Sequence, residues 1–229
     1  MKRSEINRIM LVADEFIRAR GLYLPPFAYW SPSDWRQKGE EAHEIVACRL
    51  GWDITDFGLG DFAKHGLFLF TVRNGLPENW NTRKGKLYAE KLMIVEEGQV
   101  TPLHFHWKKM EDIINRGGGK LTVRLYNSTA DEGLDRSEAV TVMVNSVRRT
   151  LPAGGVVYLS PGESITLTQF TYHEFWAEDE RTLVGEVSMV NDDSQDNRFL
   201  KAGRFPTIEE DEEPVYLLCT DYPRYYRFW

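Results

Sequence analysis

The segment from Gly98 to Gly118 constrains the fold more than any other part of the sequence. It contains His104 and His106, which are separated by one residue. Successive side chains of a β-strand point to opposite faces, so both imidazoles project from the same face of a strand. Glu111 follows five residues after His106. Two imidazoles and a carboxylate from one short segment suit a first-row divalent metal with open coordination positions.

A His-x-His pair alone fits an exposed strand that binds no metal equally well, but the surrounding spacing favours the metal. The pattern Gly-x5-His-x-His-x4-Glu-x6-Gly is complete across 21 residues. It resembles the first motif of the cupins, small double-stranded β-barrels that hold a metal inside. Cupins take a fourth ligand, a histidine, from a second motif, and His173 is the only histidine after Glu111. The match to this second motif is incomplete, because Thr168, Phe170 and Ala177 replace its Pro, Gly and Asn.

The hydrophobic pattern of the chain changes near residue 51. Residues 1–50 follow helical spacing, with helices predicted at 4–20, 34–38 and 40–50. Short segments with a period of two follow, separated by glycine-containing turns. The predicted strands are 52–57, 67–73, 91–95, 100–107, 121–127, 140–147, 156–159, 164–170, 183–190 and 215–220.

This order of elements predicts a mainly β fold. Together with the two motifs, it predicts a cupin double-stranded β-barrel of the jelly-roll kind. We expect a single domain over residues 1–229, in which the helical prologue 1–50 packs outside the barrel and C-terminal tail of 52–229.

Composition narrows the class of protein. The chain has 229 residues, 42% of them hydrophobic, and a net charge of −7. Nucleic acids and anionic membranes attract basic surfaces, so neither is an expected partner. Cys48 and Cys219 are too few for a disulfide framework and fit a reducing compartment. The sequence contains no long apolar span or apolar leader, and we therefore expect a cytoplasmic location.

Three imidazoles and one carboxylate leave two positions open in an octahedral metal shell. A divalent cation with open positions can chelate adjacent oxygens of a hydroxy-ketone or polyol. As a Lewis acid it polarises the carbonyl and eases removal of a proton from the neighbouring carbon. An aldose–ketose isomerisation through an enediol has this requirement. It also needs a base and donors for the developing oxyanion.

Several long segments carry a narrower resemblance, which spans nearly all of the chain. They are YWSPSDWRQKGEE, GWDITDFGLGDF, GLFLFTVRNG, YAEKLMIVEEGQVTPLHFHWKKMEDIINRGGG, LSPGESITL, YHEFWAE and RFPTIEEDE. Because of these segments, the chain is identified as a member of the D-lyxose isomerase family. The members of this family are manganese-dependent cupin sugar isomerases. The resemblance implies Mn²⁺ as the cofactor, a sugar substrate and a homodimer.

The resemblance also assigns roles to residues. It implies an active-site lysine at Lys91 and a carboxylate base at Glu210 or its neighbour Glu209, of which Glu210 is preferred. We further expect Asp221 to complete the polar wall near the sugar. The metal ligands implied by the family coincide with those from motif spacing: His104, His106, Glu111 and His173.

The predicted activity is the interconversion of D-lyxose and D-xylulose, and of D-mannose and D-fructose. Lyxose and mannose share their configuration at C2, C3 and C4, so a site that recognises these centres should accept both. One alternative is an iron-dependent cupin dioxygenase, which would require oxygen. Another is a non-catalytic sugar-binding cupin, which would tolerate loss of Glu111 and of the base.

Overall fold

The computed structural model describes residues 1–201 and 206–228. Arg204 and Phe205, which open the RFPTIEEDE segment, lie outside the described residues. The helices are α1 (Arg3–Arg18), α2 (Pro32–Gln37), α3 (His43–Ala47), α4 (Asn79–Thr82) and α5 (Tyr222–Tyr225), with 3-10 turns at Pro26–Tyr29 and Glu40–Ala42. The strands are β1 (Gly51–Thr55), β2 (Leu67–Arg73), β3 (Tyr88–Val95), β4 (Thr101–Phe105), β5 (Glu111–Gly117), β6 (Lys120–Ser128), β7 (Leu134–Asp135), β8 (Val140–Val144), β9 (Val147–Leu151), β10 (Val156–Leu159), β11 (Ser164–Leu167), β12 (Thr171–Glu178), β13 (Thr182–Met189) and β14 (Arg198–Phe199).

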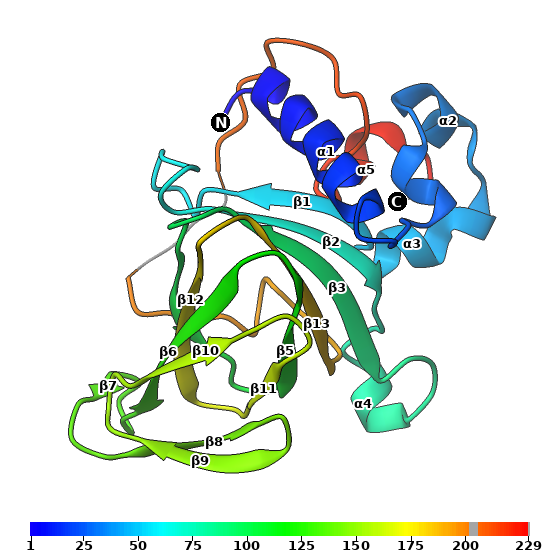
Figure 1. Ribbon diagram of the computed structural model, residues 1–229. Helices are drawn as coiled ribbons and strands as arrows, with labels where there is room; N and C mark the ends of the chain where they lie inside the picture. Colours follow the sequence, from blue (N-terminus) through cyan, green and yellow to red (C-terminus); the bar gives the residue numbers. More distant parts are fainter. Residues whose placement is uncertain (202–205, 229) are drawn as a thin grey trace.

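Two antiparallel sheets form the body of the molecule. One has the strand order β1-β2-β3-β13-β5-β11-β8-β9, and the other has the order β10-β6-β12-β4-β14, with β7 paired to β6. The sheets curl around a common interior, while α1, α2, α3 and α5 lie together beyond β1 and β2 (Figure 1). The predicted double-stranded barrel with its N-terminal helices outside is confirmed.

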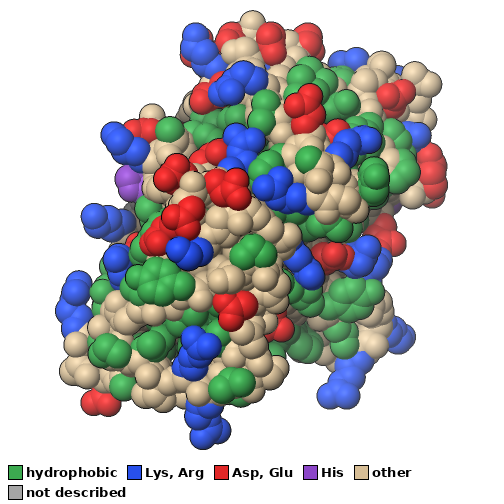
Figure 2. All heavy atoms as spheres, viewed as in Figure 1, with side chains coloured by type: hydrophobic (Ala, Val, Ile, Leu, Met, Phe, Trp, Pro, Cys, Tyr) green, Lys and Arg blue, Asp and Glu red, His purple; other side chains and the backbone are tan. Residues whose placement is uncertain are grey.

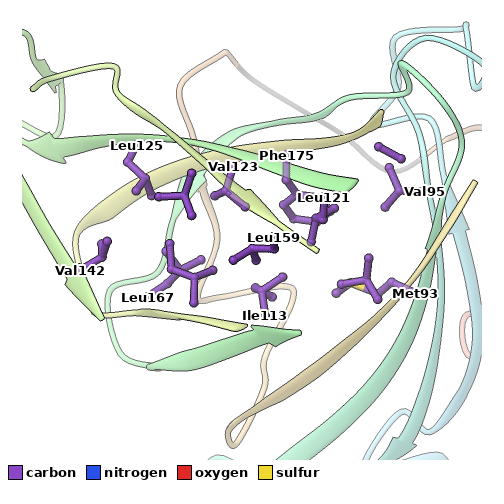
Figure 3. Close-up of a cluster of buried hydrophobic side chains, with 14 of the residues drawn as sticks. Met93, Val95, Ile113, Leu121, Val123, Leu125, Val142, Leu159, Leu167 and Phe175 are labelled. Atoms are coloured by element: carbon purple, nitrogen blue, oxygen red, sulfur yellow. The ribbon is translucent and has the colours of Figure 1, made fainter. Parts of the chain in front are cut away.

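The main core lies between the two sheets. Strand alternation directs one face of each strand inwards, and these faces carry mostly aliphatic residues. Their side chains converge from both sheets (Figure 3). The inward-facing residues include Met93, Val95, Ile113, Leu121, Val123, Leu125, Val142, Leu159, Leu167 and Phe175.

Helix α1 covers the outer face of β1, β2 and β3. Ile6, Met10, Ala13 and Ile17 are buried at helical spacing against these strands. Fully burying a large apolar side chain stabilises the fold by roughly 1.5–3 kcal/mol. The helix therefore closes one side of the sheet and leaves the opposite face of the same strands to line the interior.

The predicted strands differ from the observed structure in several places. The predicted segment 140–147 is divided into β8 and the start of β9 by Asn145 and Ser146, both with positive φ, and β5 was not predicted. The segment 164–170 ends earlier, at β11, because Phe170 adopts a left-handed conformation with φ 60°. A separate strand, β12, then begins at Thr171 and carries His173. Residues 215–220 form only an isolated bridge, in which Leu218 pairs with Trp52.

Acidic and basic side chains are interspersed over the face of the molecule shown in Figure 2. Among the described residues, no helix has both the length and the apolar character needed to cross a bilayer.

Candidate metal centre and active site

Strands β4 and β12 bring three histidines together. His104 lies in β4, and His106 follows its last residue. Phe105, between them, points to the other face and packs against Tyr172, with ring centroids 4.8 Å apart. Strand β12 pairs with β4 and places His173 opposite His104. As a result, one ring nitrogen from each histidine lies within 4.8 Å of the others.

A backbone carbonyl orients each imidazole. The Nδ1 atoms lie 2.7, 2.7 and 3.0 Å from carbonyl oxygens. A carbonyl only accepts, so each Nδ1 carries the hydrogen and each Nε2 keeps a free lone pair, which is the form that binds metals. For His104, His106 and His173, the accepting carbonyls belong to Pro102, Asp196 and Thr171, respectively.

Two of the histidines, His104 and His106, are held in their neutral form. Burial, reinforced by the two neighbouring imidazoles, lowers the pKa of His104 well below its ordinary value. Burial and the ammonium of Lys109 also lower the pKa of His106. Both rings therefore offer neutral nitrogen donors at neutral pH.

Glu111 is the first residue of β5 and completes the group. Its Oε1 lies 3.4 Å from Nε2 of His106 and 3.2 Å from Nε2 of His173. Burial opposes ionisation of this carboxyl, but Lys109, with Nζ 2.8 Å from Oε2, and His106 outweigh it. The pKa of Glu111 is consequently held well below its ordinary value, so the side chain is a buried carboxylate.

This donor set fits a divalent metal. Among the described residues, Nε2 of His106 and Nε2 of His173 have no hydrogen-bond partner. A buried polar atom without a partner costs about 1–3 kcal/mol, and lone pairs that face a carboxylate oxygen repel it. A cation between them removes both penalties. Ligands about 2.1 Å from an octahedral metal lie on the order of 3 Å from one another, similar to the observed separations.

Three of the predicted metal ligands, His104, His106 and Glu111, line a cavity of about 280 Å³. Much of the remaining wall is apolar, and Phe199 stacks on His104 with ring centroids 5.1 Å apart. The apolar lining consists of Phe57, Leu67, Leu69, Met93, Ile113, Phe175 and Phe199. The polar lining consists of Asp53, Thr55, Lys91, Thr101, Lys109, Glu186, Asp193, Ser194 and Asn197, together with His104, His106 and Glu111.

A row of charged side chains lines the cavity beside the histidines. The register of β3 and β13 places Lys91 directly opposite Glu186. Nζ of Lys91 lies 3.5 Å from Glu186 Oε2 and 3.3 Å from Asp193 Oδ1. Burial would raise the pKa of Asp193, but Lys91 and Lys109 outweigh burial and lower it. Burial and the charge of Asp193 raise the pKa of nearby Asp53 to about 6.

Lys109 links the metal ligands to this row. Its ammonium donates to Glu111 Oε2 at 2.8 Å, to Glu186 Oε1 at 2.9 Å and to Asn191 Oδ1 at 2.9 Å. An ammonium has three hydrogens, so all of its donors are used within the protein. Burial alone would lower the pKa of Lys109, but Glu111 and Glu186 raise it, and the side chain stays charged.

The loop after β13, residues 191–197, contacts His106, Lys91 and Lys109. The Asp196 carboxylate accepts the backbone N–H groups of Lys108 and Lys109 at 2.8 and 2.9 Å. Its carbonyl oxygen accepts from His106. Asp196 is itself buried, at 3% exposure. One residue therefore fixes the turn that presents Lys109 through its side chain, and the imidazole of a predicted metal ligand through its backbone carbonyl.

The sequence-predicted catalytic residues separate into two groups. Lys91 lines the cavity, as expected from the family resemblance. Glu210 and Asp221 do not belong to the described lining, and both instead bind the guanidinium of Arg3 at 2.8–2.9 Å. The structure thus places both carboxylates against Arg3, and their expected roles beside the sugar stay predictions. The Glu209 side chain is 67% exposed, and its Oε1 lies 3.9 Å from Nζ of Lys2.

Glu210 and Asp221 lie where they do because the buried guanidinium of Arg3 needs hydrogen-bond acceptors. Arg3 is only 1% exposed, and a buried guanidinium requires acceptors for its N–H groups. Glu210 and Asp221 supply two oxygens each. The carboxylates therefore neutralise an arginine at the start of α1, away from the metal ligands.

Sequence reasoning missed Lys109, Glu186, Asp193 and Asp196. Glu186 did leave a signal, because it shares the inward parity of Val184 in a strand that contains no other charged residue. An isolated carboxylate on the buried face of a strand needs partners or a function. Lys109 and Asp196 lie in turns, where no periodicity predicts the direction of a side chain.

Solved structures similar to this chain include L-ribose isomerases. L-ribose isomerase from Cellulomonas parahominis matches with a TM-score of 0.59 and 17% identity, covering 91% of this chain and 98% of that protein. L-ribose isomerase from Acinetobacter sp. DL28, solved with L-ribose, has the same TM-score, 16% identity and the same coverage. At this identity the likeness establishes the fold.

Curated relatives are far more similar in sequence. A D-lyxose/D-mannose isomerase from Serratia proteamaculans is 50% identical over 229 residues, which cover 98% of this chain and 99% of that protein. One from Escherichia coli O157:H7 is 48% identical, with coverage of 98% and 100%. Residues 1–222 also match the family described as D-lyxose isomerase. The cavity, its cluster of ligands and these matches agree, and the chain belongs to the D-lyxose isomerase family.

Proposed function

We propose that this protein is a metal-dependent aldose–ketose isomerase that interconverts D-lyxose and D-xylulose, and also D-mannose and D-fructose. One observation carries the proposal. Two imidazole nitrogens without a partner among the described residues face the Glu111 carboxylate, and His106, Glu111 and the Lys91–Glu186 pair line one cavity. The names of the curated relatives support the choice of sugars.

The metal ligands are His104, His106, Glu111 and His173, and we take Mn²⁺ as the metal. When bound there, a divalent cation would supply Lewis-acid polarisation of the sugar carbonyl and acidify the neighbouring C–H. A backbone carbonyl holds Nδ1 of each imidazole, and Lys109 favours the ionised form of Glu111, so the donor atoms are oriented before any metal arrives.

Glu186 is our candidate for the base that moves the proton between C2 and C1. Its Oε1 accepts from Lys109 at 2.9 Å, which fixes the carboxylate. Its Oε2 lies 3.5 Å from Lys91, beyond good hydrogen-bonding distance, and so keeps a lone pair available to the substrate. In the aldose-to-ketose direction this oxygen takes the proton from C2 and returns it to C1 of the enediol, while the hydroxyl proton of O2 passes to O1, so that the carbonyl moves from C1 to C2.

Lys91 and Lys109 have different roles. Lys109 has three acceptors within the protein and therefore positions Glu111 and Glu186. Lys91 has two longer contacts, at 3.3 and 3.5 Å, and retains capacity to donate to a substrate oxygen. In the reaction Lys91 stabilises the oxygen on which negative charge develops.

The apolar wall of the cavity strengthens these charge interactions. Phe57, Leu69 and Phe199 leave little room for bulk water around the reacting carbons. Electrostatic attraction is stronger where water is excluded, and a reactive enediol is protected from side reactions.

Metal removal tests the proposal. Dialysis of the protein against a chelator should abolish isomerisation of D-lyxose and D-mannose, and added Mn²⁺ should restore it. The assay is run with and without oxygen, because an iron-dependent dioxygenase would stop when oxygen is withdrawn. Persistent turnover by metal-free protein, as verified by elemental analysis, would refute the mechanism. Failure of the loaded protein to isomerise either sugar would refute the function.

We also propose that the protein works as a homodimer in the cytoplasm. The assembly is the one implied by the family resemblance, and the free Cys48 and Cys219 fit a reducing compartment. Light scattering over a range of protein concentrations measures the assembly, and cell fractionation measures the location.

A further inference from the structure

A second, smaller cavity adjoins the active-site cavity. Its volume is about 150 Å³, and it shares Asp53, Asp193 and Ser194 with the larger one. Of the proposed metal ligands, His104, His106 and Glu111 line the larger cavity, and none lines the smaller one. The remaining wall of the smaller cavity is formed by Ala47, Cys48, Arg49, Thr71, Asn74, Gly75, Pro77, Asn191, Asp192, Cys219 and Thr220. We call it the distal chamber.

Strand geometry shows how the two cavities follow one another. Leu67 and Leu69 of β2 face the larger cavity, and Thr71, two residues further along the same face, lines the distal chamber. Two residues of a strand span about 7 Å. Asp53 is paired with Leu69 and lines both spaces, so it marks their boundary. The interior therefore continues along β2 from the larger cavity into the distal chamber.

The walls of the two spaces differ in chemistry. Leucine and phenylalanine side chains line much of the larger cavity, whereas Arg49, Thr71, Asn74, Asp192 and Thr220 line the chamber. The chamber suits a hydroxylated group rather than an alkyl chain, because a buried hydroxyl requires partners. A polar space holds one water when it offers roughly 10–15 Å³, so the chamber has room for a hydroxymethyl group and its water.

Hydrogen bonds of the Asn74 side chain hold the wall of the chamber in place. The Asn74 amide donates to the carbonyl oxygens of Cys48 and Asn191 at 3.2 and 2.9 Å. Its own carbonyl oxygen accepts the Asn191 N–H at 3.0 Å. Asn74 is buried, at 5% exposure. The chamber consequently has a defined shape before a ligand enters, as expected of a binding subsite.

D-Lyxose and D-mannose differ only at the end of the chain remote from the reacting carbons. They share C1 to C4, and mannose is one hydroxymethyl group longer. A site that holds C1 and C2 near the metal ligands must find space for this extra group at its far side. The boundary residues Asp53, Asp193 and Ser194 lie where the larger cavity opens into such a space.

We propose that the distal chamber is the subsite that accepts the terminal hydroxymethyl group of aldohexoses, and that its volume sets the preference between pentose and hexose. The proposal rests on the isomerase function proposed above. Asp53, Asp193 and Ser194 form the neck through which the sugar chain passes.

Filling the chamber tests the proposal. Ala47 lies in α3 and lines the chamber, and leucine is a good helix former, so Ala47→Leu adds bulk with little cost to the helix. We expect kcat/KM for D-mannose to fall at least tenfold more than kcat/KM for D-lyxose. Thr220→Phe, at an exposed position on the chamber wall, should shift the ratio in the same direction and serves if the first variant folds poorly.

Ala63→Leu is the matched control. Ala63 lines a separate cavity beneath α1, whose lining contains none of the proposed metal ligands. This variant should keep the wild-type sugar ratio. Equal losses for both sugars in the two chamber variants would mean that the space serves entry rather than selection, and would overturn the proposal. An unchanged ratio would overturn it as well. If wild-type protein isomerises neither sugar, the proposed function fails instead.

Discussion

The protein has two clusters of charge, each around a buried cation, and they differ in how completely their hydrogen-bonding capacity is used. In the first, Arg3 receives both oxygens of Glu210 and both oxygens of Asp221. In the second, around the cavity, Glu186 keeps a weakly engaged oxygen and two imidazole nitrogens have no partner among the described residues. Both clusters join segments far apart in the chain.

This difference separates structure from function. A charge whose hydrogen-bonding capacity is used within the protein cannot bind a ligand without breaking those bonds. A charge that faces a cavity with capacity left over can do so. The Arg3 cluster therefore holds the C-terminal segment against α1. The cavity cluster has ligating and hydrogen-bonding capacity left for a metal and a sugar.

The largest expected effect comes from replacing one glutamate by glutamine in each of the two clusters and comparing the two variants. Glu186→Gln keeps shape but removes the proton acceptor, so kcat should fall by about 10³-fold while metal content stays unchanged. Glu210→Gln is the matched variant in the other cluster, and its kcat should remain within about threefold of wild type. Steady-state kinetics and elemental analysis measure both. A large loss of kcat in folded Glu210→Gln protein would restore the original assignment of the base.

Asp196→Asn should weaken metal binding. The amide accepts less well than a carboxylate, so the turn at Lys108 and Lys109 and the carbonyl behind His106 lose their anchor. Loss of such a supporting contact lowers metal affinity by about 10–100-fold. Titration of the metal-free protein with Mn²⁺ measures the affinity.

Asp192→Asn is the control for this variant. Asp192 lies in the same loop, but its carboxylate accepts from Ser194 and Gln195 rather than from the turn that carries Lys109. Its metal affinity should match wild type. Equal weakening in both variants would show that the loop as a whole, rather than Asp196, supports the metal ligands.

Asp221→Asn should destabilise the fold without touching the chemistry. The change leaves buried Arg3 with a poorer acceptor and weakens the hydrogen bond from the Leu218 N–H at 2.9 Å. Breaking a buried ion pair of this kind costs about 2–4 kcal/mol of unfolding free energy. Urea denaturation measures the loss, and kcat of the folded fraction should be preserved. Glu209→Gln, at an exposed position, should change stability by less than about 0.5 kcal/mol.

The smallest effect concerns pH. Burial and Asp193 raise the pKa of Asp53 from 3.8 to about 6, so between these values the folded state keeps a proton that the unfolded chain has released. Stability from this group is therefore present below about pH 4 and is lost as the pH rises through 6. Asp53→Asn should remove the loss and raise the unfolding free energy at pH 7 by about 1–2 kcal/mol relative to wild type.

Denaturation of wild type and Asp53→Asn at several values between pH 4 and 7 measures this difference. Comparing the two proteins at each pH cancels the opposite contributions of Glu111 and Asp193, whose pKa values are lowered. A difference that does not grow with pH would contradict the assigned environment of Asp53.

The sequence by itself determined the features that depend on local spacing. The alternation of a strand places His104 and His106 on one face, and Ser31 with Pro32 begins α2, where Ser31 and Asp34 form a capping box. The period of two along the chain indicated the barrel, and the resemblance placed Lys91 in its interior. In each case neighbouring residues carry the information.

Only the tertiary structure decided where the isolated charges lie. Glu210 and Asp221 follow Arg3 by more than 200 residues, and no local pattern predicts that they meet it. Likewise, Lys109, Glu186 and Asp193 come together because β3, β5 and β13 pair side by side. A buried charge is placed by the partners that offset its desolvation, and these partners are supplied by the whole fold.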